Sequence, residues 1–171
     1  MIMWLIGLSG AGKSTLAEAV VNDVRRRGIK NIVLVDGDVL REVWGNDLGH
    51  SLEDRKKNAD RLCRLCAYLE SQNIHAVCAI LSLFEESRQW NRENLNNYYE
   101  VYIKTSLEDL IKRDSKGLYK KALAGETELP GVNINFPEPV SPDEVILNGS
   151  DVSSLLNNSK RLSQKFYAVE C

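Results

Sequence analysis

The sequence lacks any long apolar run. No stretch of its 171 residues approaches the roughly 18 consecutive apolar residues that a transmembrane helix needs, which excludes that way of spanning a membrane. The first apolar run, residues 1–6, has the length of a strand and begins at Met1. Because it leaves no room for a signal peptide, we expect a cytoplasmic protein.

The sequence also lacks a clear excess of either positive or negative charge. The 22 Lys and Arg side chains nearly balance the 24 Asp and Glu, leaving a net charge of −2. Such a balance gives no general attraction for nucleic acid, so we expect neither a nucleic-acid nor a membrane partner. The sequence has no internal repeat, no low-complexity tract and no change of composition along its length that would mark a second domain. We therefore expect residues 1–171 to form one domain.

Cysteine is sparse, with four residues in all. The spacing Cys63-x-x-Cys66 would suit a zinc or redox site, but no second pair of cysteines or histidines completes a tetrahedral set. Both thiols fall in a long helical pattern beside Leu62 and Leu65. The pattern predicts buried structural cysteines.

What the sequence does contain is a glycine-rich stretch, residues 7–14, that fits G-x-x-x-x-G-K-[ST] without a gap. A strand-length apolar run precedes it and a helical pattern follows, which is the context in which backbone N–H groups cradle phosphates. The alternative is a plain glycine-rich turn. We predict a nucleoside triphosphate site, with Lys13 on the β- and γ-phosphates and Ser14 on Mg²⁺. The predicted ATP-binding residues are Gly7, Ser9, Gly10, Ala11, Gly12, Lys13, Ser14 and Thr15.

A second apolar strand, residues 32–35, ends in Asp36-Gly37-Asp38. Carboxylates at the carboxyl end of a strand beside a phosphate loop lie where open α/β sheets bind ligands. We predict that Asp38 is catalytic and that Asp36 joins Ser14 at the metal ion. The alternative is that Asp38 only caps the next helix.

Helical and strand patterns alternate along the remaining chain. The predicted helices cover 51–72, 85–96, 106–113 and 151–167, the first with a capping box from Ser51 to Asp54. The predicted strands cover 74–83, 98–103 and 144–147. Between them, residues 115–131 are basic, punctuated by glycine and without a strong apolar period, so nothing there requires burial. Such a segment is typical of a mobile lid.

Together, these residues resemble the adenylylsulfate (APS) kinase family over nearly the whole chain. The matching stretches are GLSGAGKST at 7–15, Asp36-Gly37-Asp38 with Arg41, Asp47-Leu48-Gly49, Asp54-Arg55 with Asn58, and KGLYKKA at 116–122. The resemblance implies a single α/β P-loop kinase domain with a five-stranded parallel sheet and helices on both faces. It also implies that ATP, with Mg²⁺, phosphorylates the ribose 3′-hydroxyl of a nucleotide.

The resemblance also suggests roles within the acceptor site. Asp38 and Lys13 would be the catalytic residues, Asp38 accepting or orienting the proton of the 3′-hydroxyl. Arg41 and Arg55 would bind acceptor phosphates, since Arg suits bidentate geometry. A lid lysine, Lys120 or Lys121, would reach phosphates on closure. The predicted acceptor-binding residues are Asp36, Arg41, His50, Arg55, Asn58, Ser82, Lys120, Lys121 and Leu129.

Four positions depart from that family. Aromatic residues that clamp the acceptor adenine are replaced by His50 and Leu129, and two arginines are replaced by Asp60 and Glu85. A pyrimidine acceptor with an uncharged end suits these changes, so we favour cytidine 5′-diphosphoramidate, used in capsule modification, over APS. A non-catalytic nucleotide switch is a further alternative, although the guanine-recognising Asn-Lys-x-Asp motif is absent. We expect the partners to be small-molecule nucleotides. The sequence does not decide between a monomer and a homodimer.

Overall fold

The computed structural model describes residues 1–114, 116–149 and 152–170, and describes side chains up to residue 168. Ser115, where the predicted lid begins, and Asp151, where the last predicted helix begins, therefore lie outside the described residues. No helix in the described ranges is both long and apolar enough to cross a membrane.

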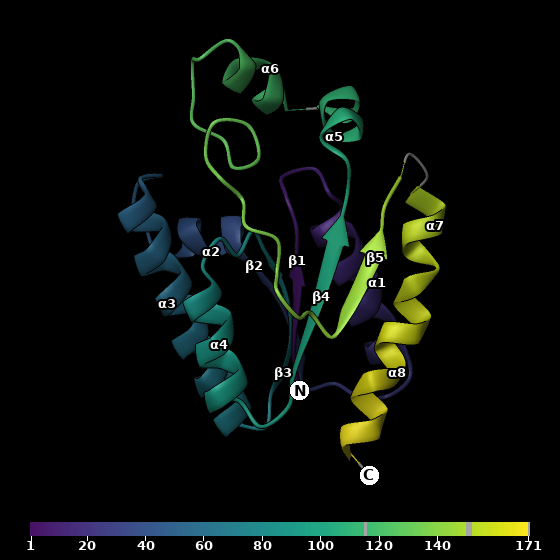
Figure 1. Cartoon of the computed structure of the whole chain (residues 1–171). Coiled ribbons are helices and arrows are strands. Elements are labelled where there is room, and N and C mark those ends of the chain that lie inside the picture. The colour runs from purple at the N-terminus through teal and green to yellow at the C-terminus, as the bar shows by residue number, and fades with distance from the viewer. Residues whose placement is uncertain (115, 150–151, 171) are drawn as a thin grey trace.

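The centre of the molecule is a five-stranded parallel sheet of order β2-β3-β1-β4-β5 (Figure 1). The strands are β1 (Ile2–Ile6), β2 (Ile32–Asp36), β3 (His75–Ile80), β4 (Tyr98–Lys104) and β5 (Glu144–Leu147). Every residue of β1 and β3 is buried, as expected for continuously apolar strands covered on both faces. The predicted fold class is confirmed.

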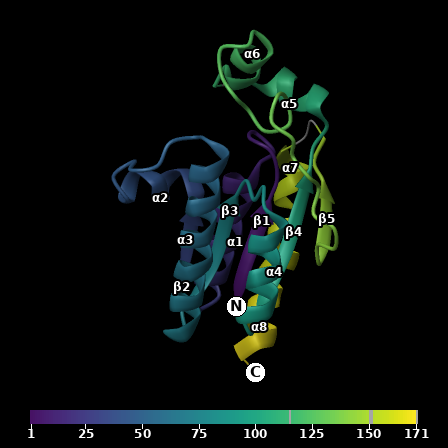
Figure 2. The same ribbon diagram turned by 60° about the vertical axis from the view of Figure 1, so that its left-hand side comes forward.

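Helices cover both faces of the sheet (Figures 1 and 2). On one face, Met3 and Leu5 of β1 join a core that includes residues of α1 (Lys13–Arg26) and α8 (Asn158–Glu170). On the other, Trp4 of β1 joins a core with α3 (Leu52–Ser71). This alternation follows from the period of two along a strand. The remaining helices are α2 (Gly37–Val43), α4 (Glu85–Asn94), α5 (Leu107–Arg113), α6 (Leu118–Leu123) and α7 (Val152–Leu156).

Two predicted boundaries are wrong. β3 ends at Ile80 rather than at residue 83, because Ser82 adopts a left-handed backbone conformation with φ of 53°. The last predicted helix is divided into α7 and α8. The Asn158 amide donates hydrogen bonds to the carbonyls of Ser154 and Leu155, each at 3.1 Å, and so satisfies groups that a continuous helix would bond through its own backbone.

Two local predictions are confirmed. The Ser51 hydroxyl accepts a hydrogen bond from the Asp54 N–H at 3.1 Å and caps α3. Cys63 and Cys66 are buried free thiols. Burial raises the pKa of Cys63 to about 12, which keeps that thiol protonated and unreactive.

The strand register brings three loops to one edge of the sheet. Ile6 pairs with Ile80, and Asp36 pairs with Ala79. The phosphate loop after β1, the acidic turn after β2 and Ser82 after β3 therefore lie side by side at the carboxyl ends of the strands. This is the edge at which open α/β sheets bind ligands.

Candidate active site

The phosphate loop leads directly into α1, and two of its glycines are required by close contacts. A Cβ on Gly7 would lie 2.7 Å from the Ile103 carbonyl oxygen. Gly12 has φ of 95°, and a Cβ there would lie 2.4 Å from the Leu155 side chain. Only glycine fits such positions without strain. The loop backbone can therefore turn tightly into the N-terminus of α1.

The Lys13 ammonium is turned onto the phosphate loop. Its Nζ donates to the Leu8 carbonyl at 2.9 Å. Burial lowers the pKa of Lys13 to about 8, against the opposing effect of the Asp38 and Asp36 carboxylates, and the positive charge of Lys116 lowers it further. An anion bound beside Nζ would restore the charged form, so the site is built to gain a phosphate.

Ser14 and Asp36 form the pair of oxygen ligands predicted for a metal ion. The Ser14 hydroxyl donates to Asp36 Oδ2 at 2.6 Å. Mg²⁺ prefers oxygen ligands and is commonly held by one or two protein groups together with substrate phosphates, so these residues fit it. Within the described ranges no cluster of three or more His, Cys, Asp or Glu side chains could hold a metal by itself.

The helix-capping role falls on Asp36, not on Asp38. Asp36 Oδ1 accepts hydrogen bonds from the N–H groups of Asp38, at 2.9 Å, and Val39, at 3.4 Å, at the start of α2. The proposed capping role for Asp38 is therefore wrong, because Asp38 lies within the helix rather than before it. Its own carboxylate has no hydrogen-bond partner in the part of the chain that the structure describes.

Asp38 lies between the two halves of the site. Its negative charge raises the pKa of Lys13 on the phosphate loop. It acts in the same direction on the pKa of His50 and of Arg55. An exposed carboxylate with electrostatic reach to both sides is placed to contact an acceptor that approaches the phosphates.

Arg41 and Arg55 concentrate positive charge on the acceptor side. Arg41 NH1 donates to the carbonyls of Leu48 and Gly49, at 3.3 and 3.0 Å, and Arg55 Nε donates to the His50 carbonyl at 2.8 Å. Burial lowers the pKa of Arg55, and so does the nearby charge of Arg41. Neither guanidinium forms an ion pair with a described carboxylate. Two half-buried like charges that share one loop suit an anionic ligand.

His50 lies on the loop that these arginines hold. Burial lowers the pKa of His50, and the charges of Arg55 and then Arg41 lower it further. Since an ordinary histidine already titrates near 6.5, the ring of His50 is largely neutral at pH 7. It can therefore offer both a donor and an acceptor nitrogen to a ligand.

Asn58, on α3, has an unsatisfied polar atom. The residue is 7% exposed, and its Oδ1 has no hydrogen-bond partner among the described residues. Buried polar atoms are nearly always bonded, so an orphan acceptor suggests a missing donor. A ligand N–H or O–H would supply one, which supports the predicted acceptor contact.

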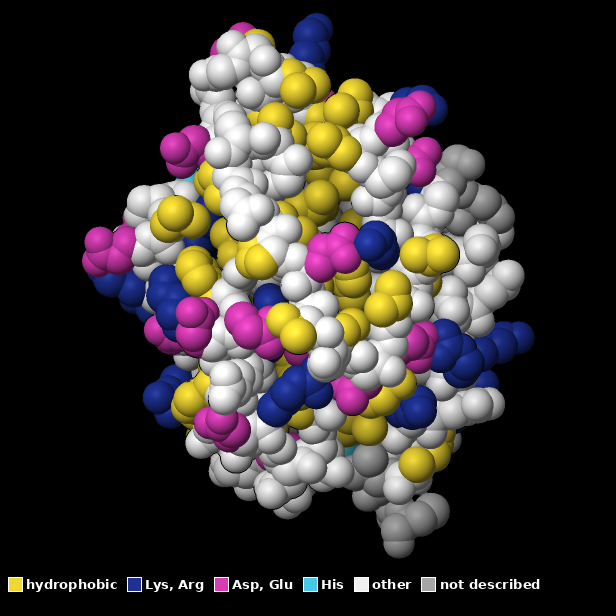
Figure 3. All heavy atoms as spheres, viewed as in Figure 1, with side chains coloured by type: hydrophobic (Ala, Val, Ile, Leu, Met, Phe, Trp, Pro, Cys, Tyr) yellow, Lys and Arg dark blue, Asp and Glu magenta, His cyan; other side chains and the backbone are white. Residues whose placement is uncertain are grey.

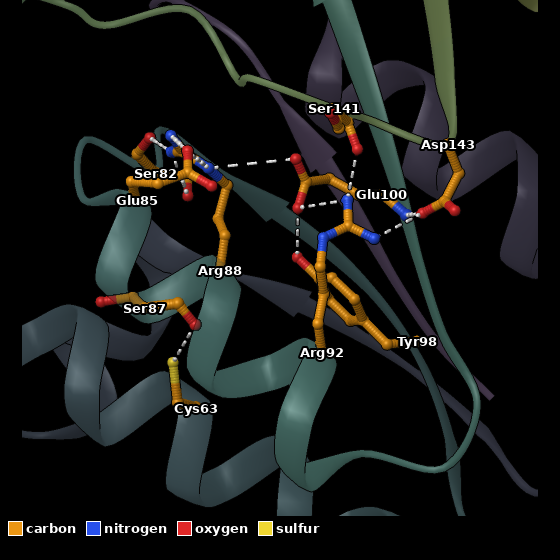
Figure 4. A network of polar contacts seen from close by, with 10 residues as sticks. All are labelled: Cys63, Ser82, Glu85, Ser87, Arg88, Arg92, Tyr98, Glu100, Ser141 and Asp143. Atoms are coloured by element: carbon orange, nitrogen blue, oxygen red, sulfur yellow. Dashed lines mark hydrogen bonds and ion pairs between the residues drawn. The ribbon is translucent and has the colours of Figure 1, made fainter.

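Ser82 is held in place by the buried Arg88 of α4 (Figure 4). Arg88 is fully buried, and its NH1 donates to the Ser82 carbonyl at 2.7 Å and to the Ser82 hydroxyl at 3.3 Å. These contacts stabilise the left-handed conformation of Ser82, which is unfavourable for a residue with a side chain. The Ser82 hydroxyl therefore serves this turn, and the predicted contact of Ser82 with an acceptor stays a prediction.

The same network continues away from the site. Arg88 also pairs with Glu85, and its Nε lies 3.9 Å from the carboxylate of Glu100 on β4. Arg92 bonds Glu100 at 3.3 Å and Asp143 at 3.4 Å, next to β5 (Figure 4). Burial raises the pKa of Glu100. The network therefore ties the Ser82 turn to β4 and to the chain before β5.

The expectation that nothing in the predicted lid requires burial is wrong. Tyr119, Ala122 and Leu129 are 2%, 4% and 6% exposed and belong to the core that includes α1. Because the Leu129 side chain is packed in this core, its position does not support the predicted contact with an acceptor base. By contrast, Lys120 and Lys121 are exposed on α6.

A groove of about 730 Å³ lies beside the phosphate loop, on the side of β4 and β5. In Figure 3, apolar side chains gather in a hollow in the upper half of this face. Leu8, Val132 and Phe136 contribute apolar walls, and Thr105 and Asn148 contribute polar ones. None of the predicted acceptor-binding residues lines this groove. Five of the predicted acceptor-binding residues lie instead on or beside α2 and α3, namely Asp36, Arg41, His50, Arg55 and Asn58.

Sequence reasoning missed three residues of the site. Lys116 lies close enough to Lys13 to lower its pKa. Tyr119 donates a hydrogen bond to the phosphate loop, and Arg88 holds Ser82. Lys116 and Tyr119 belong to the distinctive KGLYKKA stretch, which could have drawn attention to them. No local signal marks Arg88.

This arrangement of phosphate loop, metal ligands and cationic loop over a parallel sheet is that of a P-loop kinase. Residues 1–147 match the family described as adenylylsulphate kinase, and the chain belongs to that family. It is therefore an ATP-dependent phosphotransferase that acts on a hydroxyl group, with Mg²⁺.

Individual relatives fall into two functional groups. A probable adenylyl-sulfate kinase of Pseudomonas aeruginosa is 40% identical over 143 residues, 83% of this chain and 66% of that protein. A cytidine diphosphoramidate kinase of Campylobacter jejuni is 37% identical over 153 residues, 87% of this chain and 86% of that one. The solved structure of the Mycobacterium tuberculosis APS kinase CysC, in complex with AMPPNP and APS, matches with a TM-score of 0.85 and 31% identity, covering 97% and 96% of the two chains.

Proposed function

We propose that this kinase phosphorylates the ribose 3′-hydroxyl of cytidine 5′-diphosphoramidate. The observation that carries the proposal is His50, whose ring is neutral and which lies on the loop bonded by Arg41 and Arg55. At this position the adenylylsulfate kinase family has an aromatic residue that stacks on the acceptor base. A pyrimidine can be held by polar contacts to its edge, which histidine offers. The Campylobacter relative of that name, matched over 86% of its length, supports the same acceptor.

The two acidic departures favour an acceptor whose far end is uncharged. Asp60 is paired with Lys56 at 2.6 Å, and Glu85 is paired with Arg88. Two positions that carry arginine in the family therefore carry acids here. These acids form ion pairs with Lys56 and Arg88 and so neutralise their positive charge. Less positive charge remains for a terminal sulfate, whereas a phosphoramidate amide needs none.

The chain's own residues divide the reaction among them. Asp38 accepts or orients the proton of the acceptor hydroxyl, and Arg41 and Arg55 hold the acceptor diphosphate. Lys13 and the loop N–H groups neutralise the transferring phosphoryl group. Ser14 and Asp36 would hold Mg²⁺, which would supply charge neutralisation for the phosphates. Lys116, in the predicted lid of residues 115–131, adds positive charge near Lys13.

Adenylylsulfate is the second candidate acceptor. Two relatives named probable adenylyl-sulfate kinase are 40% and 42% identical to this chain over most of its length, and the similar Mycobacterium structure holds APS. A histidine ring can also stack on a base.

The non-catalytic switch has lost its support, since the chain belongs to a kinase family. A homodimer and a cytoplasmic location stay predictions.

Side-by-side kinetics of the two acceptors at saturating ATP and Mg²⁺ test the proposal. We expect a higher kcat/KM for cytidine diphosphoramidate than for APS. Stacking a base on an aromatic ring contributes about 1–3 kcal/mol, so His50→Phe should shift the ratio toward APS by about five- to 160-fold. Gln72→Phe, at the far end of α3, is the control and should leave the ratio unchanged. An APS preference of tenfold or more in the unmodified enzyme would overturn the proposal.

The pH dependence of ATP binding provides a prediction about Lys13. Its pKa of about 8 lies below the ordinary 10.5, and the ATP phosphates favour the protonated form. Above pH 8 the free enzyme loses this proton and must regain it to bind ATP. We therefore expect KM for ATP to rise above pH 8, approaching about tenfold per pH unit. Lys13→Arg, which stays charged, should flatten the profile; an unchanged slope in that variant would contradict the assignment.

A further inference from the structure

We propose that Tyr119 is a positioning residue for the phosphate loop, acting through Ser9 to turn the Gly10 N–H toward the triphosphate. The inference rests on ATP binding by the family and is independent of the acceptor. Tyr119 lies 110 residues away in the sequence, in the segment predicted to form the lid.

The contact itself is short and buried. The Tyr119 hydroxyl donates to the Ser9 carbonyl at 2.7 Å, and the residue is 2% exposed. Burial raises the pKa of Tyr119 to about 12, and the nearby Asp114 acts in the same direction. The hydroxyl therefore keeps its proton at any working pH and remains a donor to this carbonyl.

Peptide geometry converts this contact into an orientation of Gly10. In a planar trans peptide the carbonyl of one residue and the N–H of the next point in opposite directions. Fixing the Ser9 carbonyl outward therefore fixes the Gly10 N–H inward. Gly10 has φ of 76° and no side chain, so its own backbone imposes little preference. An external contact is needed to choose one orientation.

The carbonyls of Leu8 and Ala11 show the same pattern. The Leu8 carbonyl accepts from Lys13 Nζ at 2.9 Å and from the Ala11 N–H at 3.1 Å. The Ala11 carbonyl accepts from Asn148 Nδ2 at 2.8 Å. Three carbonyls of the loop thus have protein donors, whereas the Gly10 N–H has no acceptor among the described residues. An anion held by loop N–H groups would supply it.

The segment that carries Tyr119 also meets the loop a second time. A Cβ on Gly131 would lie 2.8 Å from the Leu8 side chain, so the backbone there approaches the loop as closely as glycine allows. Between these contacts, Leu129 is buried in the core. The loop is therefore held by residues 119–131 at two consecutive positions, Leu8 and Ser9. Its readiness for phosphate depends on this segment.

The test is Tyr119→Phe, with binding of AMPPNP as the readout. Phe keeps the ring and its packing and removes one hydrogen bond of the usual strength, so we expect the Kd for AMPPNP and the KM for ATP to rise about three- to tenfold. The KM for the acceptor should not change. The control is Tyr167→Phe, which removes a tyrosine–carbonyl bond of 3.2 Å to Val24, between α8 and α1. It should leave the AMPPNP Kd unchanged.

Two outcomes would overturn the inference. One is an AMPPNP Kd for Tyr119→Phe within twofold of the unmodified enzyme, or an equal loss in both variants. The other needs no variant: amide exchange at Gly10 should slow when AMPPNP binds, and an unaffected Gly10 amide would show that it does not face the phosphates. Because AMPPNP binding requires no acceptor, either result leaves the choice of acceptor untouched.

Discussion

Replacing Asp38 with Asn is expected to lower kcat by about 10²–10⁴, the usual contribution of a general base. The carboxylate has no partner within the described residues, and it lies between Lys13 and the arginine-held loop. The amide keeps the size of the side chain but cannot accept the hydroxyl proton. The α2 cap should survive because Asp36 provides it. Steady-state kinetics and AMPPNP binding are the measurements, and binding should be retained.

Glu108→Gln is the matched control, since it neutralises an exposed carboxylate on α5 whose one ion pair among the described residues is with Lys112. It should leave kcat unchanged. If Asp38→Asn lowers turnover less than tenfold, Asp38 is not the base and the assignment fails.

Lys13→Ala is expected to lower kcat by about 10²–10³, the typical effect of removing a donor to transition-state charge. The fold should persist, because the one hydrogen bond of the Lys13 ammonium within the described residues is to the Leu8 carbonyl, and the start of α1 is set by backbone geometry at Gly12. Thermal unfolding and turnover are measured together. A folded variant with undiminished turnover would remove Lys13 from the mechanism.

The chain offers a close control for Lys13. Lys30 Nζ donates to the Arg25 carbonyl at 2.8 Å, a contact of the same kind at the opposite end of α1. Lys30→Ala should reproduce any loss of stability that comes from a missing lysine–carbonyl bond. Since it lies away from the phosphate loop, kcat should not change.

Much of the fold could be predicted because its signals are local. The continuously apolar β1 and β3 indicate strands buried on both faces, and Ser51 marks the start of α3. The ends that were wrong depend on particular side-chain contacts. Ser82 ends β3 early with the help of Arg88, and Asn158 divides the last helix. Hydrophobic period carries no information about either contact.

The candidate site follows the same division. Lys13, Ser14, Asp36 and Asp38 could be predicted because they belong to short sequence motifs at the carboxyl ends of β1 and β2. The contact of Tyr119 with Ser9 spans 110 residues and exists only once the chain has packed. Leu129 shows the converse. Its position in the family pattern suggested that it binds the acceptor base, yet tertiary packing buries its side chain in the core.

The most direct test of the account is to identify the phosphorylated position by ³¹P NMR after incubating the enzyme with ATP, Mg²⁺ and cytidine 5′-diphosphoramidate. We predict one new phosphomonoester signal, coupled to the ribose H3′ and formed in step with ADP. The 3′-deoxy analogue of the acceptor should give no product. A phosphomonoester formed on that analogue, or no consumption of ATP with either the cytidine or the adenylyl acceptor, would contradict the assignment of this chain as a 3′-hydroxyl kinase.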